Sequence, residues 1–554
     1  MNDTQRLPHR ALRIHPKDNL VVALTNLTKG DQISVDGQTY TLVSNVPAKH
    51  KFATAGINPG EKVTMYGVQV GKAVVAIRQG EVITVSNIQH QAAEFRGKDS
   101  DYSWTPPDVS RWKGKTFQGF RRSDGQIGTR NHWIVVPLVF CENQNVQVLR
   151  EAFEKELGFA PREKYRSQVA DLAKLYREGR IDQIQSFQFG ETPSAAEDKK
   201  LFPNVDGIKF LTHQGGCGGT REDARSLCGL IAGYIHHPNV CGATILSLGC
   251  QNAQAAILRE EIGKRNASFD KPLLVFDQQQ SRLESTMLSD AIRETFLGLV
   301  KANQATRSAA PLSALTIGLK CGGSDGFSGI TANPAIGHVS DLIAALGGKT
   351  ILAEFPELCG VEQNLIDRSR TSSVADRFIH LMRAYAARAQ AVGSGFDMNP
   401  SPGNIKDGLI TDAMKSAGAA KKGGTSPVAD VLDYPEYATE AGLNLLCTPG
   451  SDVEAVTAQV GAGSNIVLFT SGLGTPTGNP IAPVMKLSTN SVLANGMSDI
   501  IDFDCGAIVS GGTTLEETGE AILARVIAVA SGEKTKAELL HQDDFIPWKR
   551  GVSL

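Results

Sequence analysis

The chain has 554 residues, of which 41% are hydrophobic and 21% charged, and its formal net charge is only -2 at pH 7. This composition is typical of a globular protein and excludes the disordered and fibrous classes. Because the charges nearly cancel and are interspersed, nucleic acid and anionic membranes are excluded as partners, and a small soluble ligand is expected.

The N-terminal stretch from Met1 to Pro16 lacks the apolar run of a signal peptide, and no later run is long enough to span a bilayer. The chain has nine cysteines, an odd number, which favours free thiols in a reducing compartment over a set of disulfides. No two of them form a CxxC motif, which argues against a zinc knuckle. Both observations predict a cytoplasmic protein.

The first predicted unit is a small all-β domain covering residues 1–95. Short β-like runs alternate with Gly, Asp and Asn turns between Arg13 and about Ala92. The runs are Leu20–Leu24, Gln32–Val35, Thr39–Val43, Lys62–Tyr66, Lys72–Ile77 and Val82–Val85. The polar segment that follows, with its Pro106-Pro107 pair, predicts a linker over residues 96–115.

From Thr116 onward, apolar strand-like runs alternate with helical patterns, which is typical of parallel sheets in α/β domains. The runs are Ile208–Leu211, Ala243–Leu248, Pro272–Phe276, Leu315–Leu319, Thr350–Ala353, Leu443–Cys447 and Asn465–Thr470. A break at Asn303–Pro311 divides them into domains at residues 116–310 and 311–554, the second ending in a helix over Thr518–Ser531. The predicted fold class is therefore a small all-β domain followed by two α/β parallel-sheet domains.

Ligands of open parallel sheets bind beyond the carboxyl ends of the strands, so the residues after each run are candidates for chemistry. They include His213, Cys217, Cys250, Cys321, Ser324, Asp325 and Glu354. Thiolate, imidazole and carboxylate together suit Fe(II), Mn(II) or Zn(II), although a cysteine after a strand also serves as a small buried hydrophobe. The glycine clusters match neither a P-loop nor a dinucleotide fingerprint, so no nucleotide cofactor is expected.

Further polar candidates lie before the apolar run Trp133–Val139 and in the β domain. Arg121 and Arg130 are either carboxylate-binding groups or ordinary surface arginines. His15 and His50 are either acid–base groups or bystanders. The remaining cysteines with no telling neighbour are assigned to packing: Cys228, Cys241, Cys359, Cys447 and Cys505.

Several long motifs carry a resemblance that spans essentially the whole chain. They are Ile14-His15 with Asp18-Asn19, His50-Lys51, Gly119–Arg122 with Gly128–Asn131, Cys321–Asp325 with Ser328–Pro334, Asn399–Asn404, and Gly474–Pro476. With these motifs the chain resembles the altronate and galactarate dehydratase family, including its N-terminal SAF-type β domain.

Within that family, the segment from Glu354 to Gln363 resembles the altronate members more than the galactarate ones. The resemblance implies dehydration of D-altronate to 2-dehydro-3-deoxy-D-gluconate with a divalent metal, for which Fe(II) is favoured and Mn(II) is the alternative. Galactarate or another sugar acid is the alternative substrate, and a non-catalytic sugar-acid-binding regulator is the alternative of another class. An iron–sulfur cluster on the cysteines is a third reading, against which the wide cysteine spacing argues.

The reaction removes a proton from C2 and the hydroxyl from C3, and a cation on the carboxylate would stabilise the enediolate. Under the resemblance, the metal ligands come from Cys217, Cys250, Cys321 and His213, and the catalytic groups are Glu354, Asp325, His50 and His15. Substrate binding is assigned to Arg121, Arg130, Asn131, Ser324 and Asn404. The linker-borne β domain also leaves room for a homodimer.

Overall fold

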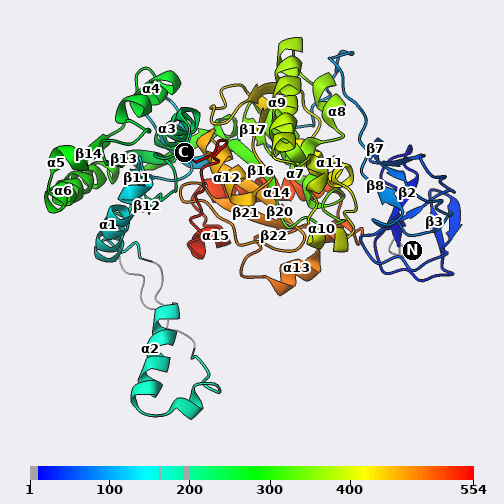
Figure 1. Ribbon diagram of the computed structural model, residues 1–554, viewed down its shortest axis with the longest axis horizontal. Coiled ribbons are helices and arrows are strands. Elements are labelled where there is room, and N and C mark those ends of the chain that lie inside the picture. Colours follow the sequence, from blue (N-terminus) through cyan, green and yellow to red (C-terminus); the bar gives the residue numbers. More distant parts are fainter. Residues whose placement is uncertain (1–9, 161–163, 191–199, 554) are drawn as a thin grey trace.

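The computed structural model describes residues 10–160, 164–190 and 200–553 and shows three parts in a row (Figure 1). The C-terminal part lies in the middle, with the N-terminal β domain at one end and the second domain at the other. The predicted fold class, a small β domain followed by two α/β domains with parallel sheets, is confirmed. No helix among the described residues is long and apolar enough to cross a bilayer.

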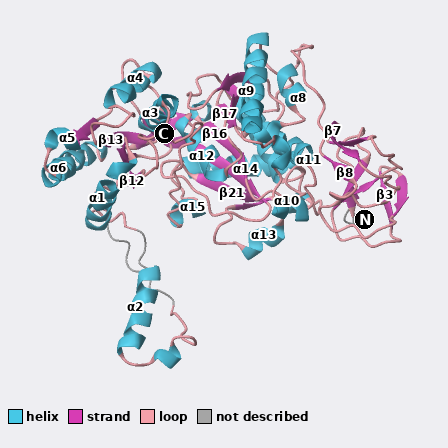
Figure 2. Ribbon diagram, in the orientation of Figure 1, coloured by secondary structure: helices cyan, strands magenta, loops and turns pink. Residues whose placement is uncertain are grey.

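The N-terminal domain consists of strands and turns over residues 10–95, without a helix (Figure 2). Its antiparallel sheets contain β1 (Ala11–Leu12), β2 (Leu20–Ala23) and β5 (Lys51–Ala53); β3 (Gln32–Val35) and β4 (Gln38–Thr41); and β6 (Lys62–Met65), β7 (Val68–Ala73) and β8 (Ile88–Gln89). Two predicted runs differ from the structure: β7 begins before Lys72, and Val82 makes only an isolated bridge with Phe52.

A small antiparallel sheet connects the linker to both α/β domains. It contains β10 (Ile127–Gly128), β9 (Thr116–Arg121) and β15 (Arg307–Pro311), in that order. The second domain is thus inserted between β10 and β15. The break predicted at Asn303–Pro311 is in part a strand, since the backbone of Arg307–Pro311 pairs with β9. The small residues of this segment resemble a loop in sequence, which is why the strand was not predicted.

The second domain has a four-stranded parallel sheet of order β12 (Gly207–Phe210), β11 (His132–Pro137), β13 (Val240–Ser247) and β14 (Leu273–Asp277). Its helices are α1 (Asn143–Glu156), α2 (Lys164–Arg177), α3 (Arg221–His236), α4 (Ala255–Arg265), α5 (Gln278–Ser281) and α6 (Glu284–Ala302). Trp133 is fully buried, and its ring fills the space that a side chain at Gly242 or Gly298 would occupy. The helix α2 projects away from the sheet (Figure 1).

The C-terminal domain is built on a seven-stranded parallel sheet. The order is β18 (Val428–Leu432), β19 (Gly442–Leu446), β17 (Lys349–Leu352), β16 (Thr316–Cys321), β20 (Ile466–Ser471), β21 (Val484–Ser488) and β22 (Phe503–Asp504). Its first strand, β16, lies inside the sheet, and later strands are added on both of its sides. The carboxyl end of β16 is therefore a topological switch point, where ligands of such sheets bind.

Helices of the C-terminal domain surround this sheet (Figure 2). They are α7 (Ala332–Ala345), α8 (Glu362–Asp367), α9 (Ser372–Ala391), α10 (Pro402–Lys406), α11 (Asp412–Ala419), α12 (Asp452–Gly461), α13 (Ser491–Gly496), α14 (Leu515–Ala530) and α15 (Lys536–Leu539). Two short 3-10 turns, η4 (Phe355–Leu358) and η6 (Ala420–Gly423), bring further side chains to the carboxyl edge.

Candidate functional site

A buried group of charged side chains and one thiol lies at the switch point. We call it the lysine cluster, and its members are Lys320, Cys321, Glu354, Glu357, Lys415 and Lys422. Lys320 and Cys321 end β16, Glu354 and Glu357 follow β17, and the other two lysines come from α11 and η6. Parallel strands that end at one edge thus deliver residues distant in sequence to one place.

The cluster is held by direct contacts between its charged groups. Glu354 binds Lys320 through Oε1 and Lys422 through Oε2, the latter at 2.8 Å. Lys422 Nζ also donates to Cys321 Sγ at 2.7 Å, and the Cys321 thiol lies 3.5 Å from Glu357 Oε2. Lys415 Nζ lies 2.8 Å from Glu357 Oε1. Each buried carboxylate therefore has at least one ammonium partner, as burial of charge requires.

These contacts fix the protonation states. Burial opposes the charge on Lys422, but Cys321, Glu354 and Glu357 outweigh it and raise the pKa of the ammonium. Burial also opposes ionisation of Glu357, yet Lys415, Lys320 and Lys422 lower the pKa of its carboxyl. Burial raises the pKa of Cys321 to about 11. The cluster therefore holds charged lysines, an ionised Glu357 and a neutral thiol at neutral pH.

The backbone at Glu354 is strained. Glu354 has φ 73° and ψ 61°, a left-handed conformation that costs a non-glycine residue about 1 kcal/mol or more. Its amide donates to Thr448 Oγ1 at 2.9 Å, which holds the turn between β17 and η4. This conformation turns the carboxylate inward between the two lysines.

Two groups of described side chains have the composition and spacing to hold a metal: Cys321, Glu354 and Glu357 in the lysine cluster, and His90, Cys359 and Asp412 beside it. In the first group, Lys320, Lys415 and Lys422 already contact all three donors. A divalent cation there would lie among ammonium groups at hydrogen-bonding distance from its own ligands. The lysine cluster therefore does not fit a metal.

The loop after β16 places Ser324, Asp325 and Asn404 together. Asn404 Nδ2 donates to the backbone oxygen of Ser324 at 2.7 Å. Asp325 is fully buried, accepts from Thr489 Oγ1 and lies 3.0 Å from Lys49 Nζ of the N-terminal domain. The Ser324 hydroxyl is buried without a partner. A buried hydroxyl without a partner suggests that a ligand supplies one.

The two candidate histidines lie in different surroundings within the β domain. His50 Nε2 lies 3.0 Å from the Lys406 carbonyl, and its buried Nδ1 has no partner. Burial lowers the pKa of His50, so Nδ1 is an acceptor when Nε2 donates. His15 instead belongs to a turn in which its Nδ1 accepts from Lys17 N. His50 thus faces the C-terminal domain, whereas His15 has a local partner.

Three family models match the chain in order. The altronate/galactarate dehydratase SAF domain matches residues 9–91, the D-galactarate dehydratase/altronate hydrolase second domain matches residues 119–303, and the D-galactarate/altronate dehydratase C-terminal domain matches residues 312–553. The altronate dehydratase of Bacillus subtilis is 32% identical over 546 residues, which are 98% of this chain and 99% of the relative. The chain belongs to the altronate and galactarate dehydratase family.

Two relatives from Escherichia coli show the same extent of similarity. Its altronate dehydratase is also 32% identical over 98% of this chain and 99% of its own length. Its galactarate dehydratase (L-threo-forming) is 30% identical over 94% of this chain and 93% of its own. Since the shared length is nearly complete on both sides, the chain is a hydro-lyase of this dehydratase family acting on a small molecule.

In this family member, the arginine motif joins domains. All five N–H groups of Arg130 donate, to Glu538 Oε1 and Oε2 and to the carbonyls of Thr129, Val529 and Glu533. Asn131 donates to two backbone carbonyls and accepts from Arg122, and Arg121 donates to the Ala309 carbonyl. Arg130 and Asn131 therefore have structural partners in place of a substrate carboxylate.

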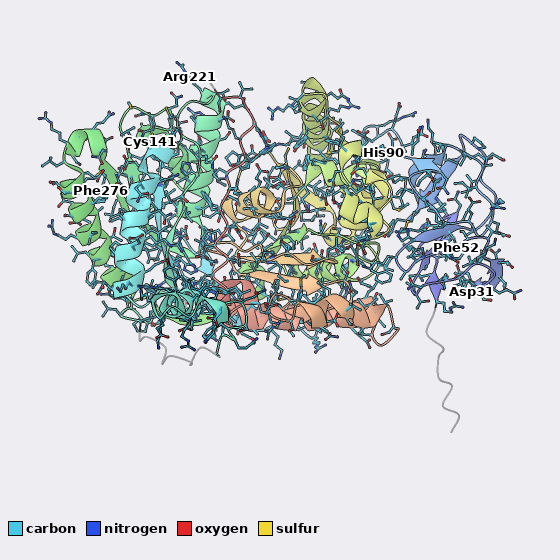
Figure 3. All side chains as sticks on the ribbon, turned by 60° about the horizontal axis from the view of Figure 1, so that its bottom comes forward. Asp31, Phe52, His90, Cys141, Arg221 and Phe276 are labelled. Carbon is cyan, nitrogen blue, oxygen red and sulfur yellow. The ribbon has the colours of Figure 1, made fainter. Side chains whose placement is uncertain are left out.

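Three of the sequence-predicted metal ligands belong to the sheet of the second domain. Cys217 and Cys250 are exposed and follow β12 and β13. His213 is buried, with Nε2 2.7 Å from the Pro137 carbonyl and Nδ1 accepting from Gly215 N. The structure does not unite them with Cys321, and neither described metal group contains them. In Figure 3, Arg221, the first residue of α3, lies on the side of the second domain, whereas His90 lies toward the N-terminal β domain.

The strand-end rule predicts Cys321 and Glu354 as site residues, but the sequence analysis assigns no role to Lys320, Lys415 or Lys422. Lys320 directly precedes Cys321 at a strand end, so the strand-end rule contained that signal. Lys415 and Lys422 are seven residues apart, the spacing of two helical turns that puts side chains on one face. That spacing is a signal in the sequence by which the two lysines could have been placed together, although α11 ends at Ala419 and Lys422 lies in η6.

Proposed function

We propose that this dehydratase removes water from D-altronate to give 2-dehydro-3-deoxy-D-gluconate. The support is the similarity to two altronate dehydratases over nearly the whole of both chains, together with a buried cluster of fixed positive charge at the switch point. Galactarate is the alternative substrate, because the galactarate relative is nearly as similar. The lysine cluster is the observation on which the mechanism rests.

The reaction develops negative charge on a carboxylate as the C2 proton leaves. Lys320 and Lys422 are held protonated by their buried anionic neighbours, so they provide cations that need no reorganisation when the enediolate forms. Glu357 is ionised and has the Cys321 thiol beside Oε2, so an unprotonated carboxylate is present to accept the C2 proton, although the three lysines that lower its pKa also weaken it as a base. The base we propose is therefore Glu357, with Glu354 holding the two lysines.

The C3 hydroxyl leaves as water once it takes a proton. Either ammonium of Lys320 or Lys422 can donate it, and the proton that Glu357 took from C2 then returns that lysine to its charged form. The enol becomes the ketone as its hydroxyl proton is lost and a proton is added at C3, so the net change is the loss of one water. Ser324 and the unpartnered Nδ1 of His50 are buried groups with free hydrogen-bonding capacity, and we assign them to substrate hydroxyls. His50 thus acts as an acceptor, because its lowered pKa does not suit the proton delivery expected from sequence.

We further propose that a divalent cation, Fe(II) ahead of Mn(II), supports this reaction from outside the lysine cluster. When bound, such an ion would supply a positive charge to the substrate carboxylate and so increase the acidity of the neighbouring C2 proton. The ammonium groups on Cys321, Glu354 and Glu357 exclude it from those donors.

The test is keto-acid production from D-altronate and galactarate by protein purified anaerobically, stripped with chelator and reconstituted with Fe(II), Mn(II) or no metal. We expect turnover of D-altronate, a loss of roughly 100-fold or more in kcat for Glu357→Gln, and no change for Glu436→Gln, an exposed control paired with Arg377. Turnover of galactarate alone would replace the substrate, and full activity of Glu357→Gln would exclude it as the base. Silence on every sugar acid would overturn the function.

A further inference from the structure

A second group of potential ligands lies where the N-terminal domain meets the C-terminal domain. His90 follows β8, Cys359 follows η4, and Asp412 is the first residue of α11. One ligand atom of each lies within 4.8 Å of the others. We call this group the junction site.

Close backbone packing brings these three segments together. Thr411, which caps α11, donates from Oγ1 to the Val70 carbonyl of β7 at 2.6 Å and so ties the helix to the β domain. Gly360 follows Cys359, and a Cβ there would lie 3.1 Å from Ala413 Cβ and 3.4 Å from Ala92 Cβ. The junction site is therefore part of a firmly packed contact between domains.

Asp412 is the observation that points to a ligand. Its side chain is fully buried, and its Oδ2 has no hydrogen-bond partner. Lys415, one turn later on α11, donates to Glu357 and to Asn399 Oδ1 instead. The other oxygen of Asp412, Oδ1, accepts from Ser416 Oγ at 3.5 Å. A buried polar atom such as Oδ2 calls for a partner such as an ion.

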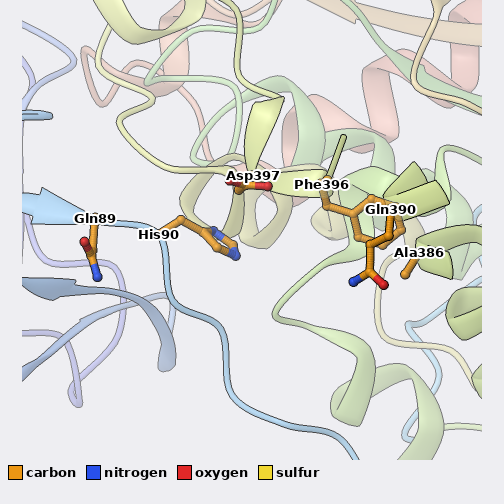
Figure 4. Close-up of a pocket in the computed structure, with 7 residues that line it drawn as sticks. Gln89, His90, Ala386, Gln390, Phe396 and Asp397 are labelled. Atoms are coloured by element: carbon orange, nitrogen blue, oxygen red, sulfur yellow. The ribbon is translucent and has the colours of Figure 1, made fainter. Parts of the chain in front are cut away.

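The junction site also differs from the lysine cluster in its access. His90 lines a cavity of about 450 Å³ together with Gln89, Phe396, Asp397 and Gln390 (Figure 4). His90 Nδ1 accepts from the amide of Ala413, next to Asp412, at 3.4 Å, which holds the ring beside the site.

We propose that His90, Cys359 and Asp412 bind one divalent transition-metal ion. Imidazole nitrogen, thiolate sulfur and carboxylate oxygen together suit Fe(II), Co(II) or Zn(II), and three protein ligands leave a coordination position open. The site deepens the proposed function, on which its catalytic role rests, by naming residues that would hold a cation outside the lysine cluster, and the ion binds whichever sugar acid is turned over.

The test is titration of chelator-stripped full-length protein with Co(II), followed by the absorption band that a thiolate gives when it binds cobalt, and by dialysis to count bound metal. We expect about one Co(II) per chain, loss of the band in Cys359→Ser, and a Kd raised at least tenfold in Asp412→Asn and His90→Gln, which corresponds to about 1.4 kcal/mol. These substitutions nearly preserve shape, and circular dichroism checks that each variant folds.

Cys321→Ser is the matched control, because it removes the buried thiol of the neighbouring group. It should keep the cobalt band in full. A band that survives Cys359→Ser, disappears in Cys321→Ser, or is absent from the parent protein would overturn the proposal. Since this readout needs no substrate, it is independent of the keto-acid assay: a cobalt band without turnover would refute the proposed function alone.

Discussion

Lys51 provides a prediction of stability that can be worked from its surroundings. Its side chain is fully buried at the contact between the N-terminal and C-terminal domains, where Nζ donates to the Gly408 carbonyl at 2.6 Å. Burial lowers the pKa of Lys51 from 10.5 to about 7, and the negative charge of Asp325 offsets only part of this effect. Replacing Lys51 with Met removes the titrating group while keeping most of the volume.

The sign and size follow from linkage. The folded-state pKa lies below that of the unfolded chain, so the unfolded chain binds more protons between pH 7 and 10.5, and stability rises with pH in that window. At 1.36 kcal/mol per pH unit of difference in pKa, the penalty is about 4 kcal/mol at pH 7 and falls by about 2 kcal/mol by pH 9. Lys51→Met lacks this dependence.

The assay is urea unfolding of the parent and Lys51→Met at pH 7, 8 and 9. We expect the stability of the variant relative to the parent to fall by about 2 kcal/mol across the series. Lys49→Met is the control, because Asp325 and Asp407 overcome burial and raise the pKa of Lys49, so its ammonium stays charged in both states over this range. An equally constant difference for both variants would refute the reasoning.

Three further predictions concern the other candidate residues. Arg130→Met should cost about 2–4 kcal/mol in urea unfolding, because the partly buried Glu538 loses its ion-pair partner and three backbone carbonyls lose a donor, whereas Arg121→Met should cost less than about 0.5 kcal/mol; equal costs would contradict the domain-joining role. Ser324→Ala should raise KM about 5- to 100-fold with an unchanged thermal midpoint, and an unchanged KM would mean that no substrate hydroxyl meets it. Cys321→Ser should lower kcat roughly tenfold or more, while the exposed Cys217→Ser should retain it, and the reverse order would place the chemistry in the second domain.

The strands that could be predicted from sequence are those buried on both faces. The runs around β13, β16, β17, β19 and β20 are nearly continuous in apolar residues, which is what a covered parallel sheet requires. The strand β21 escaped prediction, because the buried Lys486 interrupts its run and is accommodated by the Thr477 carbonyl. A tertiary partner of this kind leaves no trace in local sequence.

The candidate site was predictable only where one sheet supplies it. Cys321 and Glu354 end neighbouring strands, so the strand-end rule correctly expects them to meet. The same rule cannot tell that Cys217 and Cys250 belong to a different sheet, because it gives no order of strands. Cys359 resembles a packing residue in sequence, and only the approach of His90 and Asp412 gives it a proposed chemical role.

The sheet of β9, β10 and β15 has a consequence for how the chain is made. Arg121 of β9 and its partner Ala309 of β15 are 188 residues apart in sequence. At 5–20 residues per second, β9 leaves the ribosome about 10 to 40 seconds before β15 can pair with it. The inserted domain therefore has time to fold while one edge of β9 remains open to aggregation, and nascent chains stalled before residue 307 should be those that chaperones retain.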